Sequence, residues 1–155
     1  MITRQVNPTD FPLLEEFLYQ AVYIPEGEPL PSRDVIFDPN VYVYIKNFGA
    51  SEHDTGVIAE IGDKPVGAAW TRIIPAYGNI DDNTPELAIS ILPEYRGRGI
   101  GEVLMQHLFS LLREKGYTKT SLSVQKSNPA ARFYKRLGYE IIEEKAEDYI
   151  MVKRL

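Results

Sequence analysis

The feature that most constrains the fold is a glycine-rich turn between an apolar strand and a long amphipathic helix, within residues 87–112. The turn has glycines at three alternate positions: Gly97, Gly99 and Gly101. A turn without side chains lets a ligand approach the backbone closely, and the first amides of any helix have no partner inside it. Together with the positive end of the helix dipole, these amides predict a site for an anion such as phosphate. Arg96 and Arg98 add two positive charges beside it.

Two common phosphate-binding motifs do not describe this turn. The dinucleotide fingerprint requires G-x-G-x-x-G, whereas the spacing here is G-x-G-x-G. The P-loop requires G-x-x-x-x-G-K-[ST], which is absent from the chain. Because neither motif is met, a nucleotide-binding module is disfavoured as the function of this chain.

A second motif follows the turn, and the two together indicate a family. The run Arg96-x-x-Gly99-x-Gly101 resembles the [QR]-x-x-G-x-[GA] pyrophosphate loop of the GNAT superfamily, the acyl-CoA-dependent N-acyltransferases. Downstream lies a run that falls where that family would place it: Asn128-Pro129-Ala130-x-x-Phe133-Tyr134-x-x-Leu137-Gly138-Tyr139. The resemblance covers residues 84–139 and implies acetyl-CoA as the cosubstrate and an amine as the acceptor.

The resemblance also assigns cofactor contacts residue by residue. It implies that the diphosphate is held around the turn by Arg96, Gly97, Arg98, Gly99, Ile100, Gly101 and Glu102. Ile89 and Ile91 would offer backbone groups to the pantetheine arm, and Asn128 would hold the same arm while capping a helix. These two roles compete for one side chain, and the family usually has one more residue between this Asn and the following Ala.

The strand at residues 86–92 alternates with period two. One face carries Leu87, Ile89 and Ile91, which we interpret as core. The other face carries small or polar side chains: Glu86, Ala88 and Ser90. We expect this second face to leave room for something as thin as pantetheine.

Two residues are candidates for proton transfer during attack of an amine on a thioester. Glu86 is the candidate general base, since the family often places a carboxylate on this strand. Glu60, His53 and a chain of water molecules are alternative bases. Tyr134 is the candidate general acid, because it matches the family tyrosine that faces the CoA sulfur.

Composition limits the number of domains, the kinds of site and the partners that this chain is expected to have. The chain of 155 residues is expected to form a single domain, 1–155. It has no cysteine and only two histidines, His53 and His107, which are far apart, so no metal site is predicted. The net charge of −5 disfavours a nucleic-acid partner. No run of residues predicts a membrane helix or a signal peptide, and we expect a cytoplasmic protein.

The predicted fold is α/β (α+β), a mixed and mostly antiparallel sheet flanked by helices, in the order β-α-α-β-β-β-α-β-α-β-β seen in the GNAT fold. We expect strands at residues 2–6, 56–61, 65–74, 86–92, 120–124, 139–143 and 149–152. We expect helices at residues 11–23, 41–48, 100–115 and 129–137. Asp10 is the expected N-cap of the first helix. The buried stripe of the long helix is predicted at Ile100, Val103, Leu104, His107, Leu108, Leu111 and Leu112.

The leading hypothesis is therefore an acetyl-CoA-dependent N-acetyltransferase acting in a ternary complex. A non-catalytic acyl-CoA-binding sensor is the alternative, although the presence of both Glu86 and Tyr134 favours the enzyme. The sequence leaves open the identity of the acceptor, the length of the acyl chain and whether the protein forms a homodimer.

Overall fold

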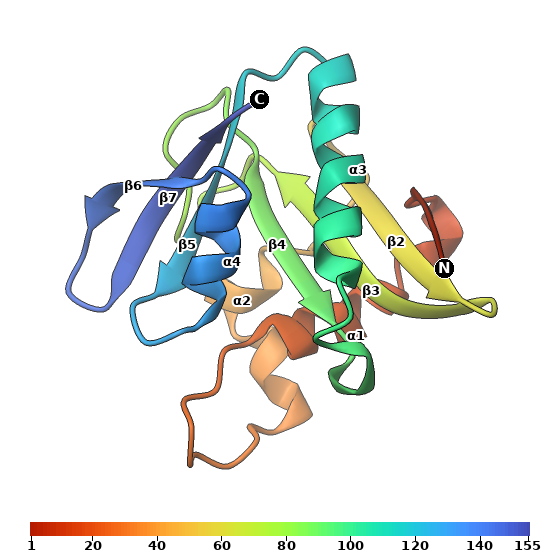
Figure 1. Cartoon of the computed structure of the whole chain (residues 1–155), viewed down its shortest axis with the longest axis horizontal. Coiled ribbons are helices and arrows are strands. Elements are labelled where there is room, and N and C mark those ends of the chain that lie inside the picture. The colour runs from red at the N-terminus through yellow and green to blue at the C-terminus, as the bar shows by residue number, and fades with distance from the viewer.

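Seven strands form one sheet with helices on both faces (Figure 1), in a computed structural model that describes all 155 residues. The strands are β1 (Ile2–Gln5), β2 (Thr55–Ile61), β3 (Lys64–Arg72), β4 (Glu86–Ile91), β5 (Lys119–Gln125), β6 (Glu140–Glu144) and β7 (Asp148–Arg154). The helices are α1 (Leu13–Ala21), α2 (Pro39–Tyr42), α3 (Ile100–Glu114) and α4 (Ala130–Arg136), with 3₁₀ turns η1 (Pro8–Asp10), η2 (Arg33–Phe37) and η3 (Pro93–Tyr95). This confirms the predicted fold class and order of elements.

The sheet is antiparallel except at its centre. Its strand order is β1-β2-β3-β4-β5-β7-β6, and only β4 and β5 run parallel. These two strands pair at a single position, Glu86 with Ser121. Beyond that pair they diverge toward their C-terminal ends, as Figure 1 shows. The sheet is therefore split along its middle, with the opening at the end where β4 leads into the glycine-rich turn.

Each face of the sheet has its own core. On one face, α3 packs Leu104, Leu108 and other residues of its buried side against the apolar side chains of the strands. On the other face, α1 contributes Phe17 and Leu18, which pack in one cluster with Trp70 of β3. Strand alternation assigns Leu87 to the first core and leaves Glu86 on the side of α1 and α2.

The N-terminal helices differ from the prediction at their ends. The helix expected at residues 11–23 spans only Leu13–Ala21, because Pro8–Asp10 forms a separate 3₁₀ turn capped by Asn7. Asp10 is therefore not the N-cap of α1; its carboxylate pairs with Arg4 at 2.6 Å. The helix expected at residues 41–48 was also wrong, since regular helix is limited to Pro39–Tyr42 and turns follow.

The buried side of α3 is rotated relative to the predicted stripe. Val103 was expected in the core, but 43% of it is exposed. Met105 and Phe109, which the stripe omits, are fully buried. Phe109 contacts Tyr139, the residue directly before β6, with ring centroids 6.2 Å apart. Because α3 covers both halves of the split sheet, its buried side is wider than that of a helix lying on one pair of strands.

Candidate active site

The glycine-rich turn forms an open cradle between β4 and α3. Gly97 and Gly99 adopt left-handed backbone conformations, with φ of 75° and 80°, which other residues adopt only at a cost. A Cβ atom at either position would meet no other atom within 4 Å. Both positions therefore face open space, and the backbone is accessible from outside.

The amides of this turn have no partners in the protein. The first backbone hydrogen bond of the helix runs from the Val103 N–H to the Gly99 carbonyl, at 3.4 Å. The backbone N–H groups of residues 97–102 make no hydrogen bond within the chain. Six consecutive free donors at the positive end of a helix of 15 residues form a site that suits an anion.

The two arginines beside the turn differ in their partners. Arg96 donates from Nε to the Ile91 carbonyl at 2.9 Å and from Nη2 to the Gln20 side chain of α1 at 3.3 Å. Its guanidinium thus ties the turn to β4 and α1. The Arg98 guanidinium lies over the Tyr95 ring at 5.2 Å and has no carboxylate partner, so its charge is available to a ligand.

The diverging edge of β4 presents backbone groups to the gap. Leu92 donates its N–H to Val66 of β3 at 2.8 Å, so alternation turns the N–H and C=O groups of Ile89 and Ile91 toward β5. No strand pairs with them there, because β4 and β5 pair only at Glu86 and Ser121. The Ile91 carbonyl accepts from Arg96, which leaves its N–H and both groups of Ile89 free.

The small face of β4 is less open than predicted. Ser90 is buried, and its hydroxyl donates to the Phe17 carbonyl of α1 at 2.6 Å. Helix α1 therefore covers the part of this face that was expected to leave room for pantetheine. The free space lies beside β4, in the split between the strands, rather than across its face.

Glu86 lies at the point where β4 and β5 separate, and only 1% of it is exposed. Its Oε2 accepts from the Tyr44 hydroxyl and from the Gly78 N–H, the latter at 2.9 Å. Its Oε1 is buried without any partner. Burial raises the pKa of Glu86 to about 7, and the bonds from Tyr44 and Gly78 limit the rise. The carboxyl can therefore exchange a proton near neutral pH, which suits a general base.

The alternative bases are engaged elsewhere. Glu60 of β2 pairs with Arg4 at 2.5 Å, and β3 separates its strand from β4. The His53 Nδ1 bonds the Tyr117 hydroxyl at 2.5 Å, beyond the C-terminal end of α3. His107 of α3 bonds Thr3 at 2.9 Å. The structure brings neither Glu60 nor His53 to Glu86, and His107, which was predicted on the buried stripe of α3 and not as a base, bonds β1 instead.

Tyr134 and Asn128 come from the segment that follows β5. Tyr134 is half-buried beside Tyr139, with ring centroids 5.8 Å apart, and burial raises its pKa to about 12. It therefore stays protonated at neutral pH and can donate. The Asn128 Oδ1 accepts from the Ala130 N–H at 2.9 Å. The N-cap of α4 is Pro129 rather than the predicted Asn128, whose bond closes the turn just before the helix. This bond uses the side-chain oxygen and leaves the nitrogen as a donor for a ligand.

Comparisons with known proteins identify the family of this chain. The acetyltransferase (GNAT) family model matches residues 18–139. The uncharacterized N-acetyltransferase YjcF of Bacillus subtilis (strain 168) is 32% identical over 131 residues, which cover 84% of each chain. The chain belongs to the GNAT family of acetyltransferases.

Other relatives extend the comparison. The streptothricin acetyltransferase of Streptomyces lavendulae is 30% identical to this GNAT protein over 131 residues, 73% of this chain and 64% of that one. The PaiA N-acetyltransferase of Thermoplasma acidophilum, solved with coenzyme A, superposes with a TM-score of 0.73 and 19% identity over the whole of both chains. YncA of Salmonella typhimurium, solved with acetyl-CoA, gives a TM-score of 0.68 at 18% identity, covering 100% of this chain and 94% of that one. Family membership makes this protein an acyl-CoA-dependent acetyltransferase.

Two groups that donate to Glu86 in this GNAT protein were missed by sequence reasoning, namely the Tyr44 hydroxyl and the Gly78 amide. Tyr44 lies 42 residues before Glu86, in a segment that was expected to be helical. Gly78 lies in the loop before β4, so close to the backbone of β5 that a Cβ would lie 2.7 Å from Ser123 N. The glycine in that loop was the only local sign of such a close approach.

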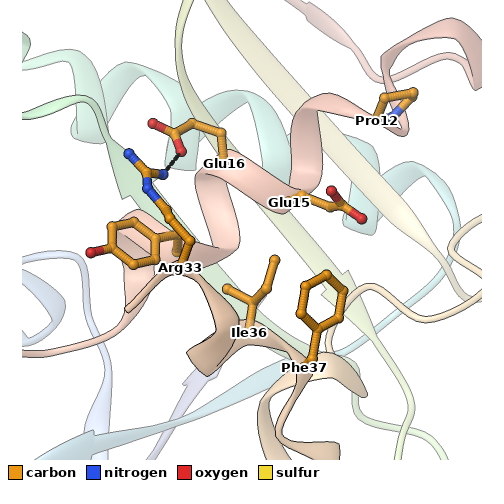
Figure 2. A pocket seen from close by; sticks show the side chains of 7 residues that line it. Pro12, Glu15, Glu16, Arg33, Ile36 and Phe37 are labelled. Carbon is orange, nitrogen blue, oxygen red and sulfur yellow. Dashed lines mark hydrogen bonds and ion pairs between the residues drawn. The ribbon is translucent and has the colours of Figure 1, made fainter. Parts of the chain in front are cut away.

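A separate pocket of about 330 Å³ lies between α1 and η2 (Figure 2). Its lining residues are Pro12, Glu15, Glu16, Tyr19, Arg33, Ile36 and Phe37. Arg33 pairs with Glu16 and lies 4.0 Å from the centre of the Tyr19 ring, so its charge is already matched. No residue of the glycine-rich turn or of β4 lines this pocket.

None of the helices has the length and apolar content needed to cross a bilayer.

Proposed function

We propose that this GNAT enzyme transfers an acetyl group from acetyl-CoA to a primary amine of a small molecule or a peptide, by direct attack in a ternary complex. The observation that carries the proposal is the buried carboxyl of Glu86, with one oxygen unpaired, at the point where β4 and β5 separate. The same split leads to the free amides of residues 97–102. The strand position of Glu86 and the anion site thus lie at opposite ends of one gap.

The residues present fit acetyl-CoA. The amides of residues 97–102 and the charge of Arg98 suit its diphosphate. Free backbone groups of Ile89 and the side-chain nitrogen of Asn128 suit the amides of its pantetheine arm. Ile91 contributes only its N–H, because Arg96 occupies its carbonyl. Acetyl-CoA supplies the activated thioester carbon that the amine attacks.

Proton transfers balance the reaction. A C–N bond forms between the amine and the acetyl carbon as the C–S bond breaks. Glu86 Oε1 takes a proton from the nitrogen, and Tyr134 gives one to the departing sulfur. The products are the acetylated amine and the CoA thiol, and exchange with water restores both side chains. The base is needed because an alkyl amine with a pKa of about 10.4 is neutral only about once in 2,500 molecules at pH 7.

The proposal is tested by thiol release. The protein is incubated with acetyl-CoA and a panel of amines, and CoA thiol is followed with DTNB. The panel contains streptothricin and a peptide with an N-terminal alanine, because relatives named as streptothricin and ribosomal-protein alanine acetyltransferases match this chain. Amine-dependent release supports the proposal. Tight CoA binding without release from any acceptor would instead indicate a sensor.

The rate is expected to depend on the ionisation of Glu86. Because its pKa is about 7, the carboxyl is protonated below that pH and cannot accept a proton. We expect kcat/KM to rise with pH by about tenfold per unit below 7 and then to level off. The acceptor is chosen so that its amine is already neutral across this range, and ionisation of the amine then adds no pH dependence of its own. A flat profile between pH 5 and 8 with such an acceptor would exclude Glu86 as the base.

Replacing Tyr134 with Phe is expected to lower kcat by about 10²-fold while CoA affinity stays within twofold. The change removes only the hydroxyl and keeps the ring that packs on Tyr139. Steady-state kinetics and calorimetry with CoA measure the two effects. Tyr149→Phe serves as the control, since this half-buried ring contacts Lys126 and lies on β7. An unchanged kcat would remove Tyr134 from the mechanism.

A further inference from the structure

The half-buried Tyr44 and the buried Glu86 are hydrogen-bonded to each other in the candidate site. The Tyr44 hydroxyl donates to Glu86 Oε2, and the Gly78 N–H donates to the same oxygen at 2.9 Å. Both donors therefore occupy one oxygen of the carboxylate. The other oxygen, Oε1, is buried and has no partner in the protein. The arrangement makes the two oxygens unequal.

The backbone around Tyr44 is fixed by side chains of β3. Trp70 donates from Nε1 to the Tyr44 carbonyl at 2.9 Å. Arg72, two residues further along the same face, donates from Nη1 to the carbonyls of Val43 at 2.9 Å and Lys46 at 2.7 Å. These bonds hold an irregular segment that has no ladder or helix of its own. They place the Tyr44 hydroxyl independently of any ligand.

Arg72 is itself held in place. It is buried, and it pairs from Nε with Asp54 Oδ1 at 2.9 Å. Asp54 also accepts from the Gly49 N–H at 2.8 Å, which closes the segment that carries Tyr44. In the ladder between β3 and β4, Arg72 lies opposite Glu86. Arg72 therefore lies opposite Glu86 in the ladder and also anchors the segment that carries Tyr44, which donates to Glu86.

We propose that Tyr44 is a positioning residue for acetyl transfer, holding Glu86 Oε2 so that Oε1 is the single oxygen that accepts the proton of the acceptor amine. This inference rests on the proposed function and adds a residue to it. Removing the hydroxyl leaves the carboxyl in place but takes away a donor that stabilises its charged form. The pKa of Glu86 should then rise further, because a hydrogen bond to the ionised form favours it.

The surroundings of Glu86 contain few other groups that could set its ionisation. Arg72 faces it from β3, with its donors directed to Asp54 and to backbone carbonyls. Burial and the neighbouring Glu86 carboxyl raise the pKa of Tyr44 above its usual range, and the backbone of Tyr77, in the loop before β4, opposes that rise. From β5, the Ser121 hydroxyl donates to the Gly78 carbonyl at 2.7 Å. Tyr44 therefore stays protonated and remains a donor while Glu86 titrates.

The test compares Tyr44→Phe with the wild-type protein in two measurements. The first is the titration of the Glu86 carboxyl carbon by NMR, assigned with Glu86→Gln, which needs no acceptor. The second is the pH profile of kcat/KM with the best amine of the panel. We expect the midpoint of the titration and the acid limb of the profile to move up together by about one pH unit. Affinity for CoA should not change.

The control is Tyr42→Phe, two residues away, where the ring packs against Phe37 instead of Glu86. It should leave both the titration and the profile where they are. Superimposable titrations for Tyr44→Phe and the wild type would overturn the inference. If Tyr44→Phe does not fold, Trp70→Phe removes the donor to the Tyr44 carbonyl and should give a smaller shift in the same direction, whereas no shift there would also overturn it. Absence of acetyl transfer by the wild type would contradict the proposed function, while the titration would still test the Tyr44–Glu86 pair.

Discussion

Replacing Glu86 with Gln is expected to lower kcat/KM by about 10²–10⁴-fold, which is the usual contribution of a general base. Gln keeps an oxygen that can accept from Tyr44 and Gly78, but it cannot take a proton. Affinity for CoA should remain, because the amides of residues 97–102 are untouched. Glu60→Gln is the matched control, since Glu60 is a carboxylate paired with Arg4 on a strand that does not border β4. A large loss in Glu60→Gln with little loss in Glu86→Gln would reverse the assignment.

Replacing Glu86 with Gln is expected to lower activity but to raise the free energy of unfolding relative to that of the wild type as pH rises. The folded pKa of Glu86 is raised from 4.5 to about 7, so the folded state binds the proton more tightly than the unfolded chain does. The wild type therefore loses stability as pH rises between these two values, by about 3 kcal/mol at most. Gln does not ionise and avoids this loss. Both proteins are unfolded thermally at pH 4.5 and at pH 8. The stability of Glu86→Gln relative to the wild type should be greater at pH 8 than at pH 4.5.

Replacing Gly99 with Val is expected to weaken CoA binding by at least about 100-fold. A Cβ at Gly99 points into open space, so the added side chain would occupy the region in front of the free amides and exclude the diphosphate. The left-handed backbone at Gly99, with φ of 80°, also disfavours a β-branched residue. Isothermal calorimetry with CoA measures the loss directly.

The opposite end of the same helix provides the control. Gly116 has a similar φ of 89°, and a Cβ there also meets no atom within 4 Å. Gly116→Val therefore carries a comparable backbone strain without touching the cradle. Both variants should lose stability by a similar amount in thermal unfolding, and only Gly99→Val should lose CoA. Normal CoA binding by Gly99→Val would show that the turn does not hold the diphosphate.

The parts of this protein that are readable from sequence are those set by neighbouring residues. The turn at residues 97–101 and the helix after it depend on local glycine spacing and apolar periodicity, and both lie where they were predicted. The hairpin between β2 and β3 is set just as locally, because Gly62 and Asp63 both adopt positive φ. The order of elements follows from the same kind of signal.

The parts that were misjudged depend on contacts between distant segments. The apolar spacing of residues 41–48 resembles a helix, but bonds from Trp70 and Arg72 hold the second half of that segment as turns. The carboxyl of Glu86 was expected on β4, yet its burial and its two donors come from segments 42 and 8 residues away. Neither donor has a local pattern that points to Glu86.

The split in the sheet has a mechanical consequence. The strands β1–β4 and the strands β5–β7 are joined in the ladder only at Glu86 and Ser121, so the two halves are held together at that pair and separate away from it. A molecule lying in the gap would bind between the halves, beyond that pair. Glu86, the proposed proton acceptor, thus lies where the backbone of β4 is held by a neighbouring strand on each side, which favours a constant position for its carboxyl while substrates enter and leave.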